Sequence, residues 1–126
     1  MTDHRSKGTR IRRQVLGDAH VDRAEAEQTE FDAAYQDLIT QSAWGHVWAS
    51  DAISMRERSM ITLALLAATG SFDEIAMHIR ATVRTGASQS DVIEAFQHVA
   101  IYAGVPKANR AIKIAKATYA EMDAER

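Results

Sequence analysis

Apolar residues recur at intervals of three and four along most of this chain, which is the spacing of one buried face on an α-helix. The spacing predicts five main helices, at residues 22–40, 55–69, 72–85, 89–103 and 106–122. No segment shows the alternating pattern of a β-strand with a hairpin turn beside it. We therefore expect an all-α fold, a single-domain helical bundle of about five main helices.

The starts of three predicted helices carry a serine followed three residues later by an acidic residue, which is the spacing of a capping box. The pairs are Ser54 with Glu57, Ser71 with Glu74, and Ser88 with Asp91. Gly70 and Gly86 are expected to end two of the helices. The helix at 55–69 is apolar on nearly all sides in its second half, so we expect it to be the central core helix or part of a subunit interface.

Residues 1–13 contain five cationic and few apolar side chains, a composition typical of a flexible, solvated basic arm. We therefore expect the folded helical domain to cover residues 14–126. That length is sufficient to form one hydrophobic core.

Composition argues against several classes of function. A net charge of -2 provides no general attraction to nucleic acid or to a membrane surface. The absence of cysteine excludes disulfides, thiolate catalysis and thiolate-bound metal. No two histidines have the His-x3-His spacing of a metal site, so we predict no metal. No apolar run is long enough to span a bilayer and no apolar signal core follows the N-terminus, so we expect a cytoplasmic location.

Glu74 and His78 are four residues apart on the third predicted helix and therefore share one face. A carboxylate beside an imidazole can exchange a proton near neutral pH. The same spacing is common on solvated helix faces, so the residues alone leave the role of this pair open. Arg80 lies about 200 degrees around the helix from His78, so both can bind one ligand only if a side chain or another subunit reaches across.

Two other groups are candidates for a site. Glu94, His98 and Tyr102 form a line at four-residue steps on the fourth predicted helix. This line is either a helix packing seam with a partly buried histidine or a second source of protons. Trp44 and Trp48 occupy a short segment that Gly45 interrupts, where they either close a small core or form the wall of a ligand site.

Several short motifs follow one another in order along the chain: Val15-Leu-Gly-Asp-x-His-Val-Asp-Arg23, Thr29-x-Phe-Asp32, Leu38-Ile-Thr40, Ala43-Trp-Gly-x-Val-Trp48, Arg58-Ser59 with Thr62-Leu-Ala64, Glu74-x3-His78-x-Arg80, and His98-Val-Ala-x-Tyr-Ala-Gly-Val-Pro106. As a set they resemble the carboxymuconolactone decarboxylase family, from about Arg13 to the last predicted helix. This resemblance implies an alkylhydroperoxidase-D-like helical fold.

The wider family includes peroxidases whose redox site has the pattern Cys-x2-Cys-x3-His. The corresponding positions here are Ser71, Glu74 and His78, so the histidine is present and both thiols are missing. Peroxide reduction through a disulfide is therefore chemically excluded. The resemblance is to the decarboxylase branch, which lacks these cysteines.

The resemblance implies cofactor-independent decarboxylation of 4-carboxymuconolactone to the enol-lactone of 3-oxoadipate and carbon dioxide. This reaction is a step in the protocatechuate branch of the β-ketoadipate pathway of aromatic catabolism. No cofactor is expected, because the lactone carbonyl can accept the electrons that carbon dioxide leaves behind. The implied partners are a small lactone dicarboxylate and further copies of the chain, in a hexamer or a trimer.

Such a reaction needs a proton donor and a cationic group that binds a carboxylate. We assign the first role to His78, oriented by Glu74, with His98 and Tyr102 as the competing acid pair. Arg58 is the first candidate for binding the carboxylate, followed by Arg80 and Arg56. Trp44 and Trp48 are expected to exclude water from the substrate. The alternatives are a related lactone hydrolase or isomerase, and a helical oligomer without catalytic activity.

Overall fold

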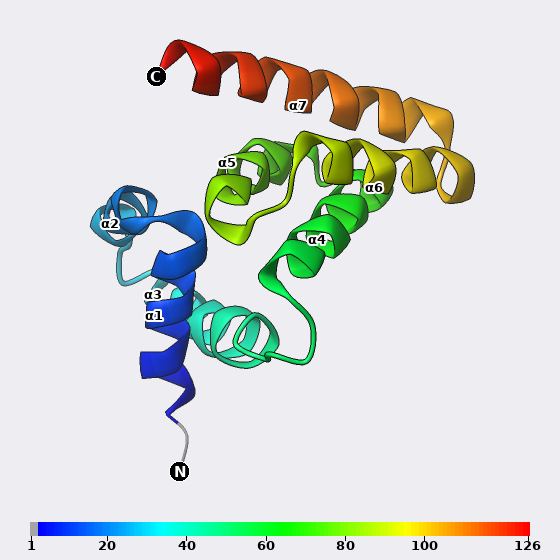
Figure 1. Cartoon of the computed structure of the whole chain (residues 1–126). Coiled ribbons are helices and arrows are strands. Elements are labelled where there is room, and N and C mark those ends of the chain that lie inside the picture. Colours follow the sequence, from blue (N-terminus) through cyan, green and yellow to red (C-terminus); the bar gives the residue numbers. More distant parts are fainter. Residues whose placement is uncertain (1–2) are drawn as a thin grey trace. The chain divides into compact units, whose positions relative to one another are not determined.

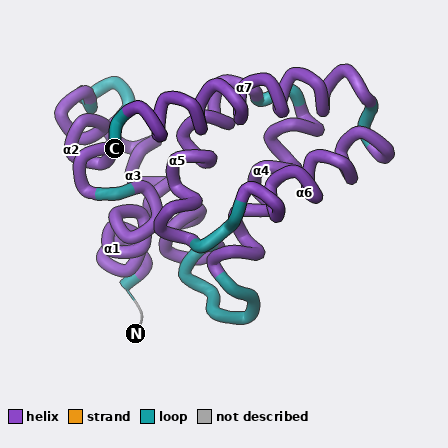
Figure 2. Tube along the Cα trace, turned by 45° about the horizontal axis from the view of Figure 1, so that its top comes forward, coloured by secondary structure: helices purple, strands orange, loops and turns teal. Residues whose placement is uncertain are grey.

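All regular elements between residues 3 and 126, the part of the chain that the computed structural model describes, are helices (Figures 1 and 2). The α-helices are α1 (His4–Leu16), α2 (Asp18–Glu27), α3 (Ala33–Ile39), α4 (Met55–Thr69), α5 (Ile75–Thr85), α6 (Gln89–Tyr102) and α7 (Val105–Ala124). A π-helix, η1 (Thr40–Val47), follows α3, and a short 3-10 helix, η2 (Phe72–Glu74), precedes α5. The all-α prediction is confirmed, but the described chain has seven α-helices rather than five. It divides between Ser54 and Met55 into two compact units.

The N-terminal unit differs from expectation at the predicted basic arm. Residues 1 and 2 lie outside the described part of the chain, but residues 4–13 belong to α1, which continues to Leu16 without a boundary at residue 13. Asp3 caps this helix by accepting hydrogen bonds from the backbone amides of Arg5 and Ser6, at 3.0 and 3.3 Å. Arg5 also forms a bidentate ion pair with Asp37 at 2.6 and 2.9 Å. This helix is therefore stabilised by tertiary contacts that the local sequence does not reveal.

Two glycines allow α1 and η1 to pack closely. A Cβ atom on Gly8 would lie 2.0 Å from the carbonyl oxygen of Thr40, and one on Gly45 would lie 2.1 Å from that of His4. Neither position can accept a larger residue unless the two helices move apart. Gly45, which interrupts the tryptophan segment in the sequence, thus serves this close approach of two backbones.

The predicted helix at 22–40 is wrong, because the structure has two helices in this region. The chain leaves α2 at Gln28, whose backbone is extended, and α3 begins at Ala33. Between them, the Asp32 carboxylate accepts a hydrogen bond from the Thr29 amide at 2.9 Å. Such side-chain bonds to nearby backbone compete with the helical hydrogen bonds and favour a turn.

The C-terminal unit is built around α4, which packs against α5, α6 and α7. This confirms the prediction that the apolar helix is central to the core. Its buried side chains Leu63 and Ala67 have no exposed surface. They join a cluster contributed by all four helices: Ile75, Ile79, Val92, Phe96, Val99, Ala108, Ala111 and Ala115. In Figure 1, α7 (orange to red) lies alongside α6 (yellow) within this unit.

The predicted caps of the C-terminal unit have mixed outcomes. The capping box at α6 is confirmed, since the Asp91 amide donates to the Ser88 hydroxyl at 3.0 Å and the Ser88 amide donates to the Asp91 carboxylate at 2.9 Å. The box at Ser71 is wrong: η2 intervenes, α5 begins after Glu74, and neither Ser71 nor Glu74 forms a side-chain cap. The Ser71 hydroxyl instead lies 3.0 Å from that of Thr69. The local bond and the 3-10 turn displace the start of α5 by three residues.

Candidate functional site

His78 lies on the buried face of α5, together with Ile75, Ile79 and Thr82. Only 7% of its surface is exposed, so the imidazole is largely removed from bulk water. Glu74 is exposed and occupies the N-cap position of α5. The structure therefore places the predicted pair at one end of the same helix, with the carboxylate in solvent and the imidazole at the edge of the core.

Arg58 lies in the first turn of α4, where it is partly buried. The neighbouring Ser59 has no exposed surface, and its hydroxyl is 2.6 Å from that of Thr85, the last residue of α5. Since the other end of α4 connects to the start of α5 through a short turn, the two helices are antiparallel. His78 precedes Thr85 by seven residues, or about 10 Å of helix. The backbone of Arg58 is thus nearer to the C-terminal end of α5 than to the end that carries Glu74.

The other two candidate arginines bind carboxylates of the protein itself. Arg56 forms a bidentate ion pair with Asp91 at 2.7 and 2.6 Å. The Arg56 guanidinium, followed by the Ser88 backbone amide, holds the pKa of the Asp91 carboxyl well below its usual range. Asp91 therefore joins α4 to the start of α6 while it also caps α6.

Arg80 is bound by the acidic end of α7. Its guanidinium lies 2.9 Å from a carboxylate oxygen of Glu121 and 3.0 and 3.1 Å from the two oxygens of Glu125. The pKa of Glu125 is lowered by its hydrogen bond to Arg80. These partners were not predicted, although the sequence carries two signals for them: the capping position of Asp91 and the acidic residues between 121 and 125. A substrate carboxylate at Arg56 or Arg80 would therefore compete with carboxylates of the protein itself.

His98 and Tyr102 lie together on α6. Their rings are stacked, with centroids 6.2 Å apart and an angle of 11° between the planes. Both side chains are exposed, Tyr102 by 84%, so the interpretation of His98 as a buried histidine at a packing seam is wrong. With Glu94 and Ile101 they line a shallow hollow of about 180 Å³ on the outer face of α6.

Trp44 and Trp48 belong to the N-terminal unit, where both are buried. Their rings stack at a centroid distance of 5.3 Å and an angle of 29°. The pair thus contributes to the apolar interior, in agreement with the first of the two roles considered for it.

The described residues 3–126 also bear on metal binding and on membrane insertion. No group of three or more histidine, aspartate or glutamate side chains there is placed to hold a metal ion. No helix in this range combines the length and the apolar character that crossing a membrane requires.

The helical architecture, with a buried histidine on α5 and no cysteine in the chain, defines the class as a cysteine-free, all-helical protein with a candidate acid–base site. The profile of the carboxymuconolactone decarboxylase family matches residues 33–117, a range that contains all nine candidate site residues. The chain belongs to the carboxymuconolactone decarboxylase family.

Individual relatives agree with this assignment. The chain is 34% identical to the 4-carboxymuconolactone decarboxylase of Acinetobacter baylyi over 116 residues, which are 92% of this chain and 87% of that protein. It is 32% identical to nitrosuccinic acid decarboxylase npaB of Metarhizium robertsii over 116 residues, or 92% of this chain and 81% of the relative. A 38-residue segment is 47% identical to the 4-carboxymuconolactone decarboxylase of Pseudomonas putida, covering 30% of this chain and 79% of that protein. The names of these relatives indicate decarboxylase activity in the family.

Proposed function

We propose that this protein decarboxylates 4-carboxymuconolactone to the enol-lactone of 3-oxoadipate and carbon dioxide, without a cofactor, in the protocatechuate branch of the β-ketoadipate pathway. The observation that carries this proposal is the 34% identity to the Acinetobacter baylyi enzyme over nearly the whole of both chains. A match of 116 of the 126 residues includes every residue to which a catalytic or binding role is assigned below.

The proposed reaction moves one electron pair from the broken C–C bond to the lactone carbonyl. When the ring carboxylate leaves as carbon dioxide, the electron pair of the broken C–C bond moves through the ring double bond to the lactone carbonyl. The resulting dienolate then takes a proton on carbon. The protein must therefore stabilise negative charge on the carbonyl oxygen, deliver a proton, and bind the carboxylate that remains.

We assign proton delivery to His78. The burial of its imidazole supports this role, because a site closed to bulk water strengthens electrostatic interactions and limits competing protonation. Glu74, at the start of the same helix, is assigned to orient the imidazole or to set its charge. His98 with Tyr102 remains the competing acid pair. Both side chains are exposed on α6, so this pair suits proton delivery only if another copy of the chain covers that face.

We assign Arg58 to the remaining carboxylate, with Arg80 and Arg56 as further candidates. Arg58 is partly buried in the first turn of α4, where water screens a contact between opposite charges less than it does at an exposed site. The guanidinium fork suits a carboxylate better than an ammonium group does.

A second substrate is favoured by the relative that acts on nitrosuccinic acid, which matches the chain over the same length. The nitro group of nitrosuccinic acid and the unsaturated lactone share one chemical property: each can accept the electron pair that departing carbon dioxide leaves. One proton donor can therefore serve the decarboxylation of either substrate. The lactone is the first choice because the relative from Acinetobacter baylyi is more similar, at 34% against 32% identity, and is matched over 87% of its length against 81%.

The test is an assay of purified protein with each substrate, in the presence of a chelator, that follows carbon dioxide and the second product. We expect turnover of the lactone. A His78→Ala variant should lose turnover while keeping the circular dichroism of the wild type. His98→Ala tests the competing acid pair, and His46→Ala, at an exposed histidine with no assigned role, serves as the matched control. Carbon dioxide from nitrosuccinate alone would transfer the proposal to the second substrate, and none from either would refute decarboxylation.

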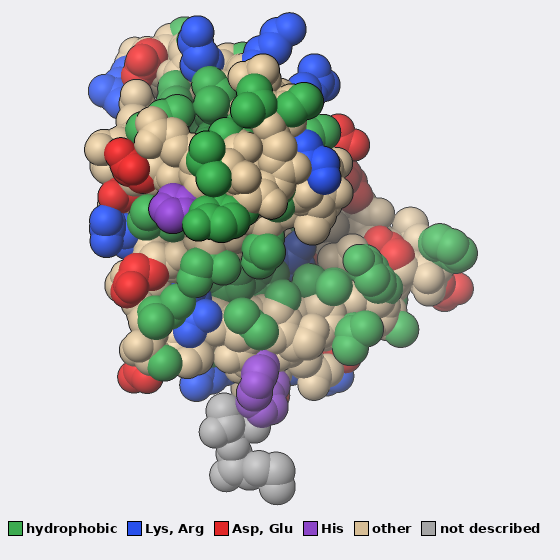
Figure 3. Space-filling model, turned by 90° about the vertical axis from the view of Figure 1, so that its right-hand side faces the viewer, with side chains coloured by type: hydrophobic (Ala, Val, Ile, Leu, Met, Phe, Trp, Pro, Cys, Tyr) green, Lys and Arg blue, Asp and Glu red, His purple; other side chains and the backbone are tan. Residues whose placement is uncertain are grey.

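We also propose that the protein acts as a homo-oligomer, a trimer or a hexamer. Apolar side chains remain exposed on the C-terminal unit, among them Ile61 and Leu65 on one face of α4 and Ile101 beside Tyr102 on α6. Figure 3 shows hydrophobic side chains at several places on the surface that it draws. Such exposure favours association between copies. Light scattering coupled to size exclusion should give the mass of a trimer or hexamer; the mass of a single chain at working concentration would contradict the proposal.

A further inference from the structure

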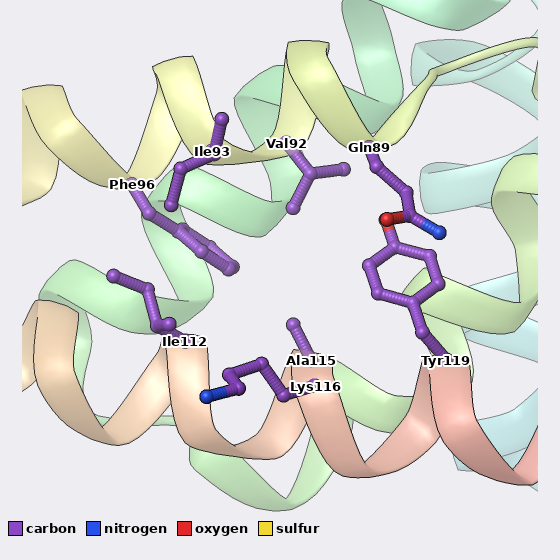
Figure 4. Close-up of a pocket in the computed structure, with 8 residues that line it drawn as sticks. All are labelled: Gln89, Val92, Ile93, Phe96, Ile112, Ala115, Lys116 and Tyr119. Atoms are coloured by element: carbon purple, nitrogen blue, oxygen red, sulfur yellow. The ribbon is translucent and has the colours of Figure 1, made fainter.

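A pocket of about 150 Å³ lies between α6 and α7, and none of the residues assigned to decarboxylation lines it. Its walls, drawn in Figure 4, are Gln89, Val92, Ile93 and Phe96 from α6, and Ile112, Ala115, Lys116 and Tyr119 from α7. Five of these eight side chains are aliphatic or aromatic hydrocarbon. A pocket with this lining suits an apolar body with few polar groups.

One polar group in the wall lacks a partner. The hydroxyl of Tyr119 is buried and has no hydrogen bond within the described residues. An unsatisfied buried hydroxyl is unfavourable, and a ligand that supplies a hydrogen bond relieves that cost. In Figure 4 the Tyr119 ring extends from α7 towards Gln89 of α6, at one end of the pocket.

The opposite side of the pocket is positively charged. The Lys116 ammonium lies on the far side of the drawn pocket from the Tyr119 ring (Figure 4). Four cationic residues and no acidic residue occur between Val105 and Ala117 on α7: Lys107, Arg110, Lys113 and Lys116. This half of α7 therefore attracts anions.

We propose that the pocket between α6 and α7 binds a small aromatic carboxylate that carries a hydroxyl group on the opposite side of its ring. The ring lies among Val92, Ile112 and Phe96, where an aromatic neighbour adds edge or stacking contacts. The carboxylate pairs with Lys116, and the ligand hydroxyl exchanges a hydrogen bond with Tyr119. This site is separate from the proposed decarboxylation, and either assignment can fail without the other.

Three probes are used. 4-Hydroxybenzoate carries both polar groups, benzoate carries the carboxylate alone, and benzyl alcohol carries a hydroxyl alone. Methyl-labelled wild-type protein is titrated with each, and the signals of Val92, Ile93 and Ile112 are followed by NMR. We expect saturable shifts of these methyl groups, with 4-hydroxybenzoate the tightest ligand of the three. Absence of saturable shifts at these residues with 4-hydroxybenzoate would overturn the proposal, as would shifts confined to other parts of the chain.

Two variants separate the polar contacts. Lys116→Gln should lower the affinity for both carboxylate probes by about fivefold. Lys113→Gln, one turn away and outside the pocket, should leave the affinity unchanged. Tyr119→Phe should lower the affinity for 4-hydroxybenzoate by about threefold to tenfold and leave the affinity for benzoate unchanged. Because it removes an unsatisfied buried hydroxyl, it should not lower the melting temperature of the free protein. Equal effects of the two lysine variants, or of Tyr119→Phe on both acids, would refute the assigned contacts. Turnover of the lactone by Lys116→Gln should match the wild type.

Discussion

The hydrogen bond between Ser59 and Thr85 allows a quantitative test of how the C-terminal unit is held together. The two hydroxyl oxygens are 2.6 Å apart, Ser59 has no exposed surface, and Thr85 is 8% exposed. The bond joins the start of α4 to the end of α5, so it sets the alignment of the helices that carry Arg58 and His78. Removing one hydroxyl leaves the other buried, which typically costs about 1–3 kcal/mol of unfolding free energy.

The expected value lies in the lower part of this range. A serine or threonine in a helix can turn its hydroxyl to the carbonyl oxygen four residues earlier, which recovers part of the lost bond. We therefore predict that Ser59→Ala and Thr85→Val each reduce the unfolding free energy by about 1–2 kcal/mol. The double variant should lose about 1 kcal/mol less than the sum of the two, because it leaves neither hydroxyl unpaired.

The assay is urea unfolding followed by far-ultraviolet circular dichroism. Tryptophan fluorescence is unsuitable, because both tryptophans lie in the N-terminal unit. Hydrogen exchange of the α4 and α5 amides assigns the loss to these helices. Strictly additive effects of the two substitutions would show that the hydroxyls do not interact, and would refute the reasoning.

Three further predictions concern catalysis, pH and packing. His78→Ala should reduce turnover of the lactone by about 10²–10⁴-fold at unchanged helix content, and a full rate in both this variant and His98→Ala would refute proton delivery by either of these two histidines. The pKa of Asp91 is lower in the folded than in the unfolded state, so its contribution to stability is present above the unfolded value near 3.8 and is lost as the pH falls below it. Urea midpoints at pH 7 and pH 3 should therefore differ less in Asp91→Asn than in the wild type, and an equal difference would contradict this. Gly8→Ala should destabilise the N-terminal unit by about 1–3 kcal/mol, since its Cβ would meet backbone atoms of η1; tryptophan fluorescence measures this loss against the exposed control Gln14→Ala, and equal stabilities would refute the close contact.

Much of the fold followed from short-range patterns. Apolar spacing predicted the helical class and placed α4, α6 and α7 within one or two residues of their observed bounds. The capping box at Ser88 was correct because its bonds are local and complete within four residues. The glycines after α4 and α5 were correct for a similar reason: both adopt positive φ, at 76° and 89°, which favours glycine.

The predictions failed where a distant segment supplies the stabilising contact or where two local patterns compete. Helix α1 has a polar sequence and is held by the close approach of Gly8 to η1 and by the Arg5–Asp37 pair, 32 residues apart in the chain. At Ser71 and at residues 28–32, side-chain bonds to nearby groups compete with a continuous helix, and helical spacing cannot rank these alternatives.

The same distinction applies to the site. The sequence by itself determined the residue types available for chemistry, the absence of redox thiols and the resemblance to the family, because these depend only on identity and order. Only the tertiary structure decided that His78 is buried while His98 is exposed, and that Arg56 and Arg80 bind carboxylates from other helices. Burial and ion pairing depend on which helices meet, and those contacts are set by the packing of the whole unit rather than by any local pattern.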